Sequence, residues 1–313
     1  MIVRLGYVAL SKTIENITAS KTITYTNYLK NPDQLKVEYL IKENLNNLSE
    51  ILDYNIKNNI HFYRITSKLI PLGTHQEVKF DYIEQFQKYY DELGYKIRKH
   101  NMRVDFHPDQ FTVLNSTKEE VIKNTFEILN YHYKLIVALR IDPPVIILHV
   151  GGNTFGKQKS ITRFINNFNK LPNEIKNAIV VENDDKIFNV KDVLQLTTKL
   201  NIPFVLDYHH HLCNNDGLCI DDYLYDILKT WKKSRPKIHF SSPKSKIKKE
   251  IRSHHEYIDV DSFITFIDKL KKYDIDVDIM LEAKGKDEAL FRLVRQLKYK
   301  TNYRFIDETS FEV

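Results

Sequence analysis

The chain has 313 residues, of which 42% are hydrophobic and 28% are charged. This length and composition allow one large domain with a deep core. No stretch approaches the roughly eighteen consecutive apolar residues that a membrane span requires, so we expect no membrane partner. The net charge of +6 and the pI near 8.9 suit a polyanionic partner, although many basic proteins bind no nucleic acid.

The N-terminal residues and the cysteines bear on the compartment. Residues 1–11 lack the basic start, the long apolar run and the small-residue cleavage site of a secretory signal, so we expect a cytoplasmic protein. Cys213 and Cys219 form a lone C-x5-C spacing without the second ligand pair of a structural zinc site. We therefore expect two free thiols.

Strand-like and helix-like segments alternate along the chain. Ile2 to Ala9 is the first predicted strand, and apolar residues at helical spacing predict a helix within Pro32 to Asn59. His61 to Ile65 begins the second unit. Met102 to Phe106 begins the third, whose helix is expected to open with a capping box from Thr117 to Glu120. The remaining predicted strands are Val145–Leu148, Ala178–Val181, Pro203–Leu206, Lys237–Phe240 and Val277–Leu281.

This alternation predicts a parallel sheet, and continuous apolar runs such as Val145 to Leu148 indicate strands buried on both faces. A doubly wound open sheet would gather its ligands at one switch point. Here candidate ligands follow at least seven of the eight predicted strands. We therefore predict an α/β fold of the (β/α)8 TIM barrel type. Residues 1–313 are expected to form one domain, with the last dozen or so residues as a C-terminal tail.

Nine of the twelve histidines, together with several carboxylates, follow short apolar runs. The carboxyl ends of all TIM barrel strands meet at one rim, so ligands that are scattered in sequence would converge there. The rim candidates are His75, His107, His149, Glu182, Asp207, His210, His239 and Glu282. Other histidines are assigned to structure or turned away from the rim by strand alternation, namely His61, His100, His132, His209 and His211.

Carboxylates at the mouth of an apolar barrel are costly unless cations neutralise them. Mixed imidazole and carboxylate ligands suit Mn, Zn or Fe and disfavour a pure Mg or Ca site. At about four to six donors per ion, this set would hold two or three ions. Metal ions about 3.5 to 4 Å apart are typical of phosphoester hydrolysis, so the pattern favours phosphoryl chemistry.

The segment from Lys237 to Arg252 is rich in lysine and includes Lys244 and Lys246. Such a loop can neutralise DNA phosphates without reading sequence, although a solvated basic loop is the competing interpretation. Lys237 lies two residues before His239 and so faces the same side of its strand. Because an ammonium beside metal ions is costly, we expect Lys237 to be neutral or carboxylated and to support the cluster. A surface lysine at the start of the strand is the alternative.

Eight short strings extend this pattern over most of the chain. They are Leu5-Gly6-Tyr7, Arg64-Ile65-Thr66-Ser67, His107-Pro108-Asp109-Gln110-Phe111, His149-Val150-Gly151-Gly152, Glu182-Asn183-Asp184, Asp207-Tyr208-His209-His210, His239-Phe240-Ser241-Ser242-Pro243 and Leu281-Glu282-Ala283-Lys284. In their order and spacing, from about residue 2 to residue 290, they resemble the UV damage endonuclease family, a relative of endonuclease IV. The resemblance implies a xylose isomerase-like barrel with a divalent cluster, usually of manganese, that nicks DNA immediately 5′ to UV photoproducts.

The resemblance also implies roles for individual residues. The implied metal ligands are His75, His107, His149, Glu182, Asp207, His210, His239, His254 and Glu282, and the adjacent His255 leaves the register at His254 open. Gln110 and Phe111 are implied to push into the duplex and unstack the damaged step, whereas ordinary loop packing is the alternative for Phe111. Tyr7 is expected either to contact the lesion or to pack in the core.

We predict that the protein binds damaged duplex DNA across its rim. In-line attack by a metal-activated water would leave a 3′-hydroxyl and a 5′-phosphate. The expected catalytic residues are Glu182, His210, Lys237 and Glu282, with Mn²⁺ favoured over Zn²⁺ or another divalent ion. The alternatives are an abasic-site endonuclease, a metal-dependent sugar isomerase and a DNA-binding protein with a decayed site. We expect a monomer without an obligate protein partner, while the sequence leaves the lesion preference and the metal open.

Overall fold

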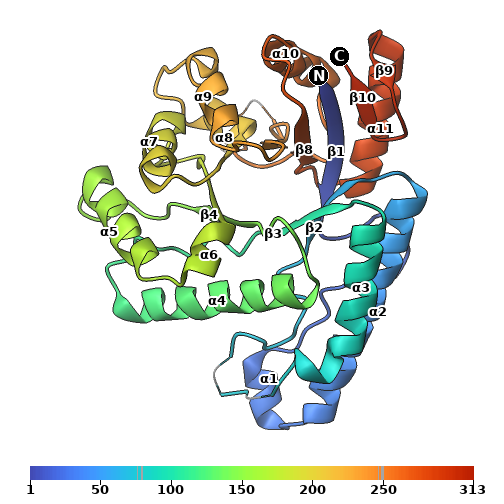
Figure 1. Ribbon diagram of the computed structural model, residues 1–313, viewed down its shortest axis with the longest axis vertical. Helices are drawn as coiled ribbons and strands as arrows, with labels where there is room; N and C mark the ends of the chain where they lie inside the picture. Colours follow the sequence, from blue (N-terminus) through green and yellow to red (C-terminus); the bar gives the residue numbers. More distant parts are fainter. Residues whose placement is uncertain (76, 79, 246, 248–249) are drawn as a thin grey trace.

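Parallel strands close into a barrel in a computed structural model of the chain, which describes all residues except Gln76, Lys79, Lys246, Lys248 and Lys249 (Figure 1). The barrel strands are β1 (Ile2–Val8), β2 (Phe62–Ile65), β3 (Arg103–Phe106), β4 (Ile146–His149), β5 (Ile179–Glu182), β6 (Phe204–Asp207), β7 (Lys237–Phe240) and β8 (Val277–Leu281). Each pairs in parallel with its neighbours in sequence, and β1 pairs with both β2 and β8. This closure confirms the predicted TIM barrel and excludes the open sheet.

Helices follow the strands and surround the barrel (Figure 1). The longer ones are α2 (Gln34–Lys57), α3 (Gln87–Lys99), α4 (Glu119–Ala138), α5 (Lys157–Asn169), α7 (Val190–Leu200), α10 (Val260–Lys271) and α11 (Lys286–Lys300). The shorter ones are α1 (Tyr25–Lys30), α6 (Asn173–Ala178), α8 (Tyr208–Cys213) and α9 (Leu224–Lys229), with 3-10 turns η1 (Glu84–Phe86) and η2 (Ile220–Asp222). Among the described residues, no helix is long and apolar enough to cross a membrane.

Each predicted barrel strand begins and ends within one residue of its observed bounds. The expected capping box at Thr117 to Glu120 is wrong. Helix α4 begins at Glu119, and its capping residue Lys118 makes no side-chain hydrogen bond. Instead, the Ser116 hydroxyl accepts a hydrogen bond from the Lys118 backbone N–H at 3.1 Å. This local turn competes with the capping box for the backbone just before the helix.

The residues expected to form a tail add two short strands to the sheet. These are β9 (Arg304–Phe305) and β10 (Ser310–Glu312), which pair antiparallel with each other. Strand β10 also pairs antiparallel with the first half of β1, which places the two termini side by side (Figure 1). Phe311 of β10 is fully buried. Strands this short carry no periodicity from which they could be predicted.

Strand alternation decides which side chains fill the barrel. On one side, Ile147, Val180 and Val205 form an apolar cluster with Val145 and Trp231. Successive side chains of a strand point to opposite faces, so the residue two positions further on shares the inward face. That residue is His149 in β4, Glu182 in β5 and Asp207 in β6. The apolar filling therefore sets the positions of these polar side chains at the carboxyl end.

A charged network fills the amino-terminal end of the barrel. The buried Asp278 carboxylate of β8 accepts two hydrogen bonds from Arg4, at 2.6 and 2.7 Å, and a third from Arg103 at 2.8 Å. Burial alone would raise the pKa of Asp278, but these guanidinium groups hold it below its ordinary value. The paired guanidinium groups therefore offset the cost of burying this carboxylate.

Replacement of this carboxylate should destabilise the fold. We expect Asp278→Asn to lower the free energy of unfolding by about 3–5 kcal/mol, because it leaves the partly buried guanidinium groups of Arg4 and Arg103 without their anion. Urea unfolding at neutral pH would measure the loss. The matched control is Asp261→Asn, whose 71% exposed carboxylate pairs with Lys300 and should matter by less than about 0.5 kcal/mol.

The same comparison has a pH dependence. Because folding lowers the pKa of Asp278, its contribution is fully present above the pKa of the unfolded chain and is lost as the pH falls through the folded pKa. The difference in unfolding free energy between wild type and Asp278→Asn should therefore narrow in acid. A difference that widens as the pH falls would contradict this account.

Candidate metal centre

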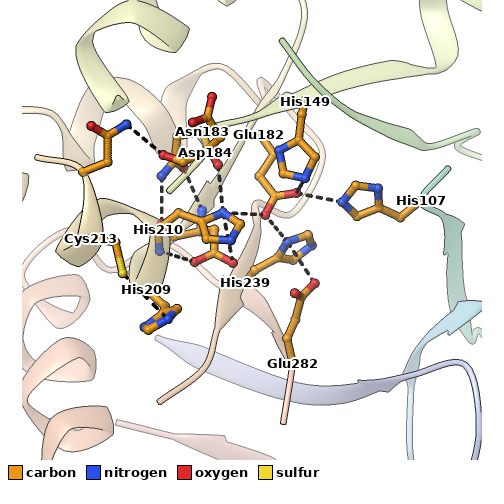
Figure 2. Close-up of polar contacts among 12 residues, drawn as sticks. His107, His149, Glu182, Asn183, Asp184, His209, His210, Cys213, His239 and Glu282 are labelled. Atoms are coloured by element: carbon orange, nitrogen blue, oxygen red, sulfur yellow. Dashed lines mark hydrogen bonds and ion pairs between the residues drawn. The ribbon is translucent and has the colours of Figure 1, made fainter. Parts of the chain in front are cut away.

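Glu182 lies at the centre of a cluster of histidines at the carboxyl end of the barrel (Figure 2). Its Oε2 atom lies 2.9 Å from His107 Nε2 and 3.7 Å from His149 Nε2. Its Oε1 atom lies 2.8 Å from His239 Nδ1 and 3.5 Å from His210 Nδ1. The four imidazoles come from different strands or from the segments that follow them. One buried carboxylate thus joins four parts of the barrel.

Two further carboxylates extend the cluster. Asp207 ends β6 and accepts a hydrogen bond from the His210 backbone N–H at 2.7 Å through Oδ1. Its Oδ2 atom is buried and has no hydrogen-bond partner among the described residues. Glu282 follows β8, and its Oε1 atom lies 3.3 Å from His239 Nδ1. The unpartnered oxygen of Asp207 is an acceptor that a cation would satisfy.

Three groups of these side chains could hold a metal ion. They are His107, His149 and Glu182; Glu182, Asp207 and His210; and Asp207, His239 and Glu282. Within each group the donor atoms lie within 4.8 Å of one another. Glu182 and Asp207 each belong to two groups, so each offers a carboxylate that can be shared. Imidazole and carboxylate donors in this mixture suit a divalent transition metal.

Backbone carbonyl oxygens orient three of the histidines. The Nδ1 atom of His107 lies 3.0 Å from the Pro108 carbonyl oxygen. In the same way, His210 Nδ1 lies 2.9 Å from the Asn183 oxygen, and His254 Nδ1 lies 2.7 Å from the Glu282 oxygen. A carbonyl can only accept, so in each contact Nδ1 carries a proton. This pattern is typical of histidines that bind metals through Nε2.

The pKa shifts show that carboxylates are crowded in the cluster. Burial, together with Glu182 and Glu282, raises the pKa of Asp207 well above its ordinary value, although His210 opposes the shift. Burial would also raise the pKa of Glu182, but the neighbouring imidazoles of His239 and His149 hold it well below its usual range. Burial lowers the pKa of His210, yet the surrounding carboxylates raise it to about 9. Bound cations would relieve this competition for positive charge.

The cluster rests on charged residues inside the barrel. The buried Lys237 amino group donates to Asp105 at 2.5 Å, and burial lowers the pKa of Lys237 to about 7 despite that partner. Arg64 donates to Glu282 Oε1 at 2.7 Å and lies 2.6 Å from His239 Nε2. Neither Arg64 nor Asp105 was predicted as a site residue. The signal was available, since each is a charged residue at an inward position of a short buried strand.

His75 and Tyr7 do not lie where their predicted roles require. His75 is exposed and stacks on Tyr25 of α1, with ring centroids 3.9 Å apart, and it belongs to none of the three groups formed by the described residues. Tyr7 is fully buried, and its hydroxyl donates to Asn55 of α2 at 2.8 Å. Alternation along β1 turns Tyr7 away from the inward face that carries Arg4. Tyr7 is therefore not placed to reach DNA, which corrects the expected lesion contact.

The histidines near the edge of the cluster differ in whether they point toward it. The His254 ring lies 6.4 Å from that of His210, whereas His255 is exposed and accepts a hydrogen bond from the Tyr257 backbone N–H at 2.9 Å. The structure therefore turns His254, not His255, toward the cluster. His209 and His211 belong to none of the three groups among the described residues, but they lie in helix α8, so helix geometry rather than strand alternation directs them.

The loop after His107 carries the residues that were expected to enter DNA. Gln110 is exposed, and the Phe111 side chain is 75% exposed. In the basic segment, the Lys244 amino group is ion-paired with Glu250, so its charge is partly neutralised in the free protein. Lys246 lies outside the described residues.

Comparisons with known proteins decide the family. A model of the UV-endonuclease UvdE family matches residues 3–311. The chain belongs to this family. A relative in Bacillus cereus strain G9842, named UV DNA damage endonuclease, is 42% identical over 303 residues that cover 95% of each chain. A relative of the same name in Bacillus anthracis is 41% identical over 318 residues and covers all of both chains.

Solved structures agree with the UvdE assignment. The crystal structure of SacUVDE is 34% identical to this chain, with a TM-score of 0.86, and the match covers 95% of this chain and 98% of that one. A D-tagatose 3-epimerase-like protein is 14% identical, with a TM-score of 0.58 and coverage of 95% and 96%. At that identity the second likeness shows the fold alone, and it agrees with the xylose isomerase-like barrel.

Metal content should depend on Glu182 more than on Glu282, because Glu182 belongs to two of the three groups and Glu282 to one. After dialysis against Mn²⁺ and removal of free metal, elemental analysis should find fewer ions in Glu182→Gln than in Glu282→Gln. Added Mn²⁺ should also raise the Tm less in Glu182→Gln than in Glu282→Gln, because an ion at about 100 times its Kd stabilises the fold by roughly 2.7 kcal/mol.

Two histidines outside the cluster, His61 and His255, provide matched controls for this experiment. His61→Asn, at the opposite end of the barrel beside Asp307, should keep the wild-type metal content. His255→Asn should also keep it, whereas His254→Asn should lower it. Equal metal content in Glu182→Gln and wild type would refute the assignment of the centre.

Proposed function

We propose that this protein is a metal-dependent DNA endonuclease that cuts duplex DNA immediately 5′ to UV photoproducts. The observation that carries the proposal is the Glu182-centred cluster at the rim of a barrel that belongs to the UvdE family. The relatives named UV DNA damage endonuclease support the choice of substrate. The proposed site of action is the cytoplasm.

The proposed cofactor is a cluster of two or three divalent ions, with Mn²⁺ favoured over Zn²⁺. The residues that would hold it are His107, His149, Glu182, Asp207, His210, His239 and Glu282, with His254 at the edge. When bound, such ions supply positive charge to the reacting phosphate and lower the pKa of a water molecule. His75 is left out of the set because it stacks on Tyr25.

The chain's own residues fix the shape of this site. Asn183 accepts a hydrogen bond from the Asp207 backbone N–H and donates one to the Asp207 carbonyl, each at 2.9 Å, which ties the ends of β5 and β6 together. Arg64 holds Glu282 beside His239. We propose that Lys237 is neutral or carboxylated in the loaded protein, because its amino group is buried and its pKa is lowered to about 7. Side chains held in this way are positioned before DNA arrives.

Recognition of the lesion is assigned to the loop after β3. The exposed ring of Phe111 has apolar surface available to insert at a damaged step, where the bases are already poorly stacked. Gln110 is proposed to take up hydrogen bonds that the displaced bases lose. Lys244 and Lys246 are proposed to contact backbone phosphates. To do so, Lys244 must break its ion pair with Glu250 and form one with a phosphate.

Incision should require Glu182. With a labelled duplex that carries one cyclobutane dimer and with Mn²⁺ present, the wild type should make a single cut 5′ to the dimer, and chelator should abolish it. Glu182→Gln should lower the rate by at least about 10³-fold, because loss of the shared carboxylate removes several kcal/mol of charge stabilisation in the transition state. Binding of the same duplex should fall far less.

Undamaged and abasic duplexes serve as substrate controls. Cutting of the abasic duplex alone would assign the protein to the neighbouring class of endonucleases and reject the proposal. Wild-type incision rates in Glu182→Gln would reject the assigned site.

Phe111 should matter for damaged DNA only. Phe111→Ala should weaken binding to the dimer-containing duplex by about 5- to 100-fold, the range for loss of one aromatic stacking partner. Phe111→Tyr should retain binding because it keeps the ring. Fluorescence anisotropy in chelator, with the undamaged duplex as control, measures both. A similar loss on both duplexes would show that Phe111 does not recognise damage.

A further inference from the structure

The segment between β4 and α5 presents a second exposed phenylalanine on the rim. Phe155 is 74% exposed, nearly as much as Phe111. Single exposed apolar residues are common on protein surfaces, so exposure alone implies no function. However, the backbone of Phe155 has a φ of +65°, in the left-handed region that bulky side chains rarely adopt. An aromatic residue is thus held in a strained conformation with its ring in water.

The core of the free protein gives no reason for a phenylalanine at this position. Phe155 belongs neither to the buried clusters nor to the partly buried apolar residues packed against them, among the residues described. Among the residues that the structure describes, the Phe155 ring makes no ring-stacking or cation–π contact, whereas Phe164 and Phe168 of the following helix stack on each other. Glycine or asparagine would adopt this backbone with less strain. Strained residues of this kind are concentrated at functional sites.

The Phe155 loop is joined to the loop that carries Phe111. The Asn115 side chain donates to the Gly152 carbonyl at 2.5 Å. From α5, Arg163 donates to the carbonyl of Asn115 at 2.8 Å and to that of Thr154 at 2.6 Å. One guanidinium therefore links the residue just before Phe155 to the loop that is proposed to enter DNA.

The two loops also pack closely. Gly151 has a φ of +108°, and a Cβ atom at this position would lie only 2.4 Å from Asn115 Oδ1 and 2.9 Å from Val113 Cβ. Only glycine permits this approach. Because His149 ends β4 just before this loop, Phe155 is held six residues beyond a member of the metal centre.

We infer that Phe155 is a second aromatic contact to DNA, which stacks on an unstacked base beside the step that Phe111 opens. The inference rests on the proposed endonuclease function, because it requires DNA to cross this rim. A rigid ring in water suits a base because every base has a π face, so the contact is independent of sequence. A phosphate would instead require a donor, which phenylalanine lacks.

The first test removes the ring and keeps the backbone conformation. Asparagine tolerates the left-handed region, so Phe155→Asn should fold with an unchanged or higher Tm. Its affinity for a dimer-containing duplex should fall about tenfold, as for loss of one stacked base. Anisotropy in chelator measures binding without incision. The matched control is Tyr299→Asn, which removes a 90% exposed ring from α11 and should not alter affinity.

The second test observes stacking directly. The chain has a single tryptophan, Trp231, which is buried in the barrel. Phe155→Trp therefore adds one exposed indole, whose fluorescence a stacked base should quench when the duplex is added. Its affinity should remain close to that of the wild type. The wild-type protein, with Trp231 alone, gives the background signal.

The outcomes separate this inference from the proposed function. If wild type binds and cuts damaged DNA, while Phe155→Asn binds equally well and Phe155→Trp is not quenched, the inference is wrong and the function stands. A lower Tm with unchanged affinity in Phe155→Asn would assign the ring to packing and would also overturn the inference. If wild type neither binds nor cuts the dimer duplex, the proposed function fails and the inference fails with it.

Discussion

The arrangement of the rim depends on one buried carboxylate. Glu182 lies within 3.7 Å of the imidazoles of four histidines, and the barrel leaves it almost no contact with water. A carboxylate in such a place is tolerated only where opposite charge or hydrogen-bond donors surround it. The strands supply those groups because inward positions at their carboxyl ends converge on one point. The convergence of the strand ends therefore supplies the partners that this buried carboxylate requires.

The barrel interior has an apolar side and a charged side. Branched apolar side chains usually occupy such interiors. Here they fill the side formed by β4, β5 and β6, beside Trp231. The remaining side holds paired charges in layers, with Arg4 and Asp278 at the amino end and Lys237 and Asp105 above them. The ion pair of Lys237 with Asp105 lies beneath the cluster and restrains the side chains on which the cluster rests.

Much of the fold and of the candidate metal centre was predictable because both follow from local patterns. The expected strand at residues 145–148 is observed at residues 146–149, and the candidate ligands His149, Glu182 and Asp207 lie at the carboxyl ends of β4, β5 and β6. The positions of His75 and Tyr7 were not predictable in this way. His75 stacks on a helix from another loop, and the face of Tyr7 depends on a neighbouring helix. Arg64 was not predicted because its role depends on a hydrogen bond to Glu282, which lies 218 residues away in the sequence.

The pairing of β10 with β1 determines where anything attached to this protein would lie. The Met1 amino group donates to the Val313 carbonyl at 3.4 Å, so both ends of the chain meet at the amino end of the barrel. The candidate metal centre is at the other end. A fused domain, an affinity tag or a surface linkage at either terminus would therefore lie away from the rim at which we propose that duplex DNA binds. The adjacent ends also suit circular permutation, in which a short linker joins them and the chain is opened in a loop remote from the rim.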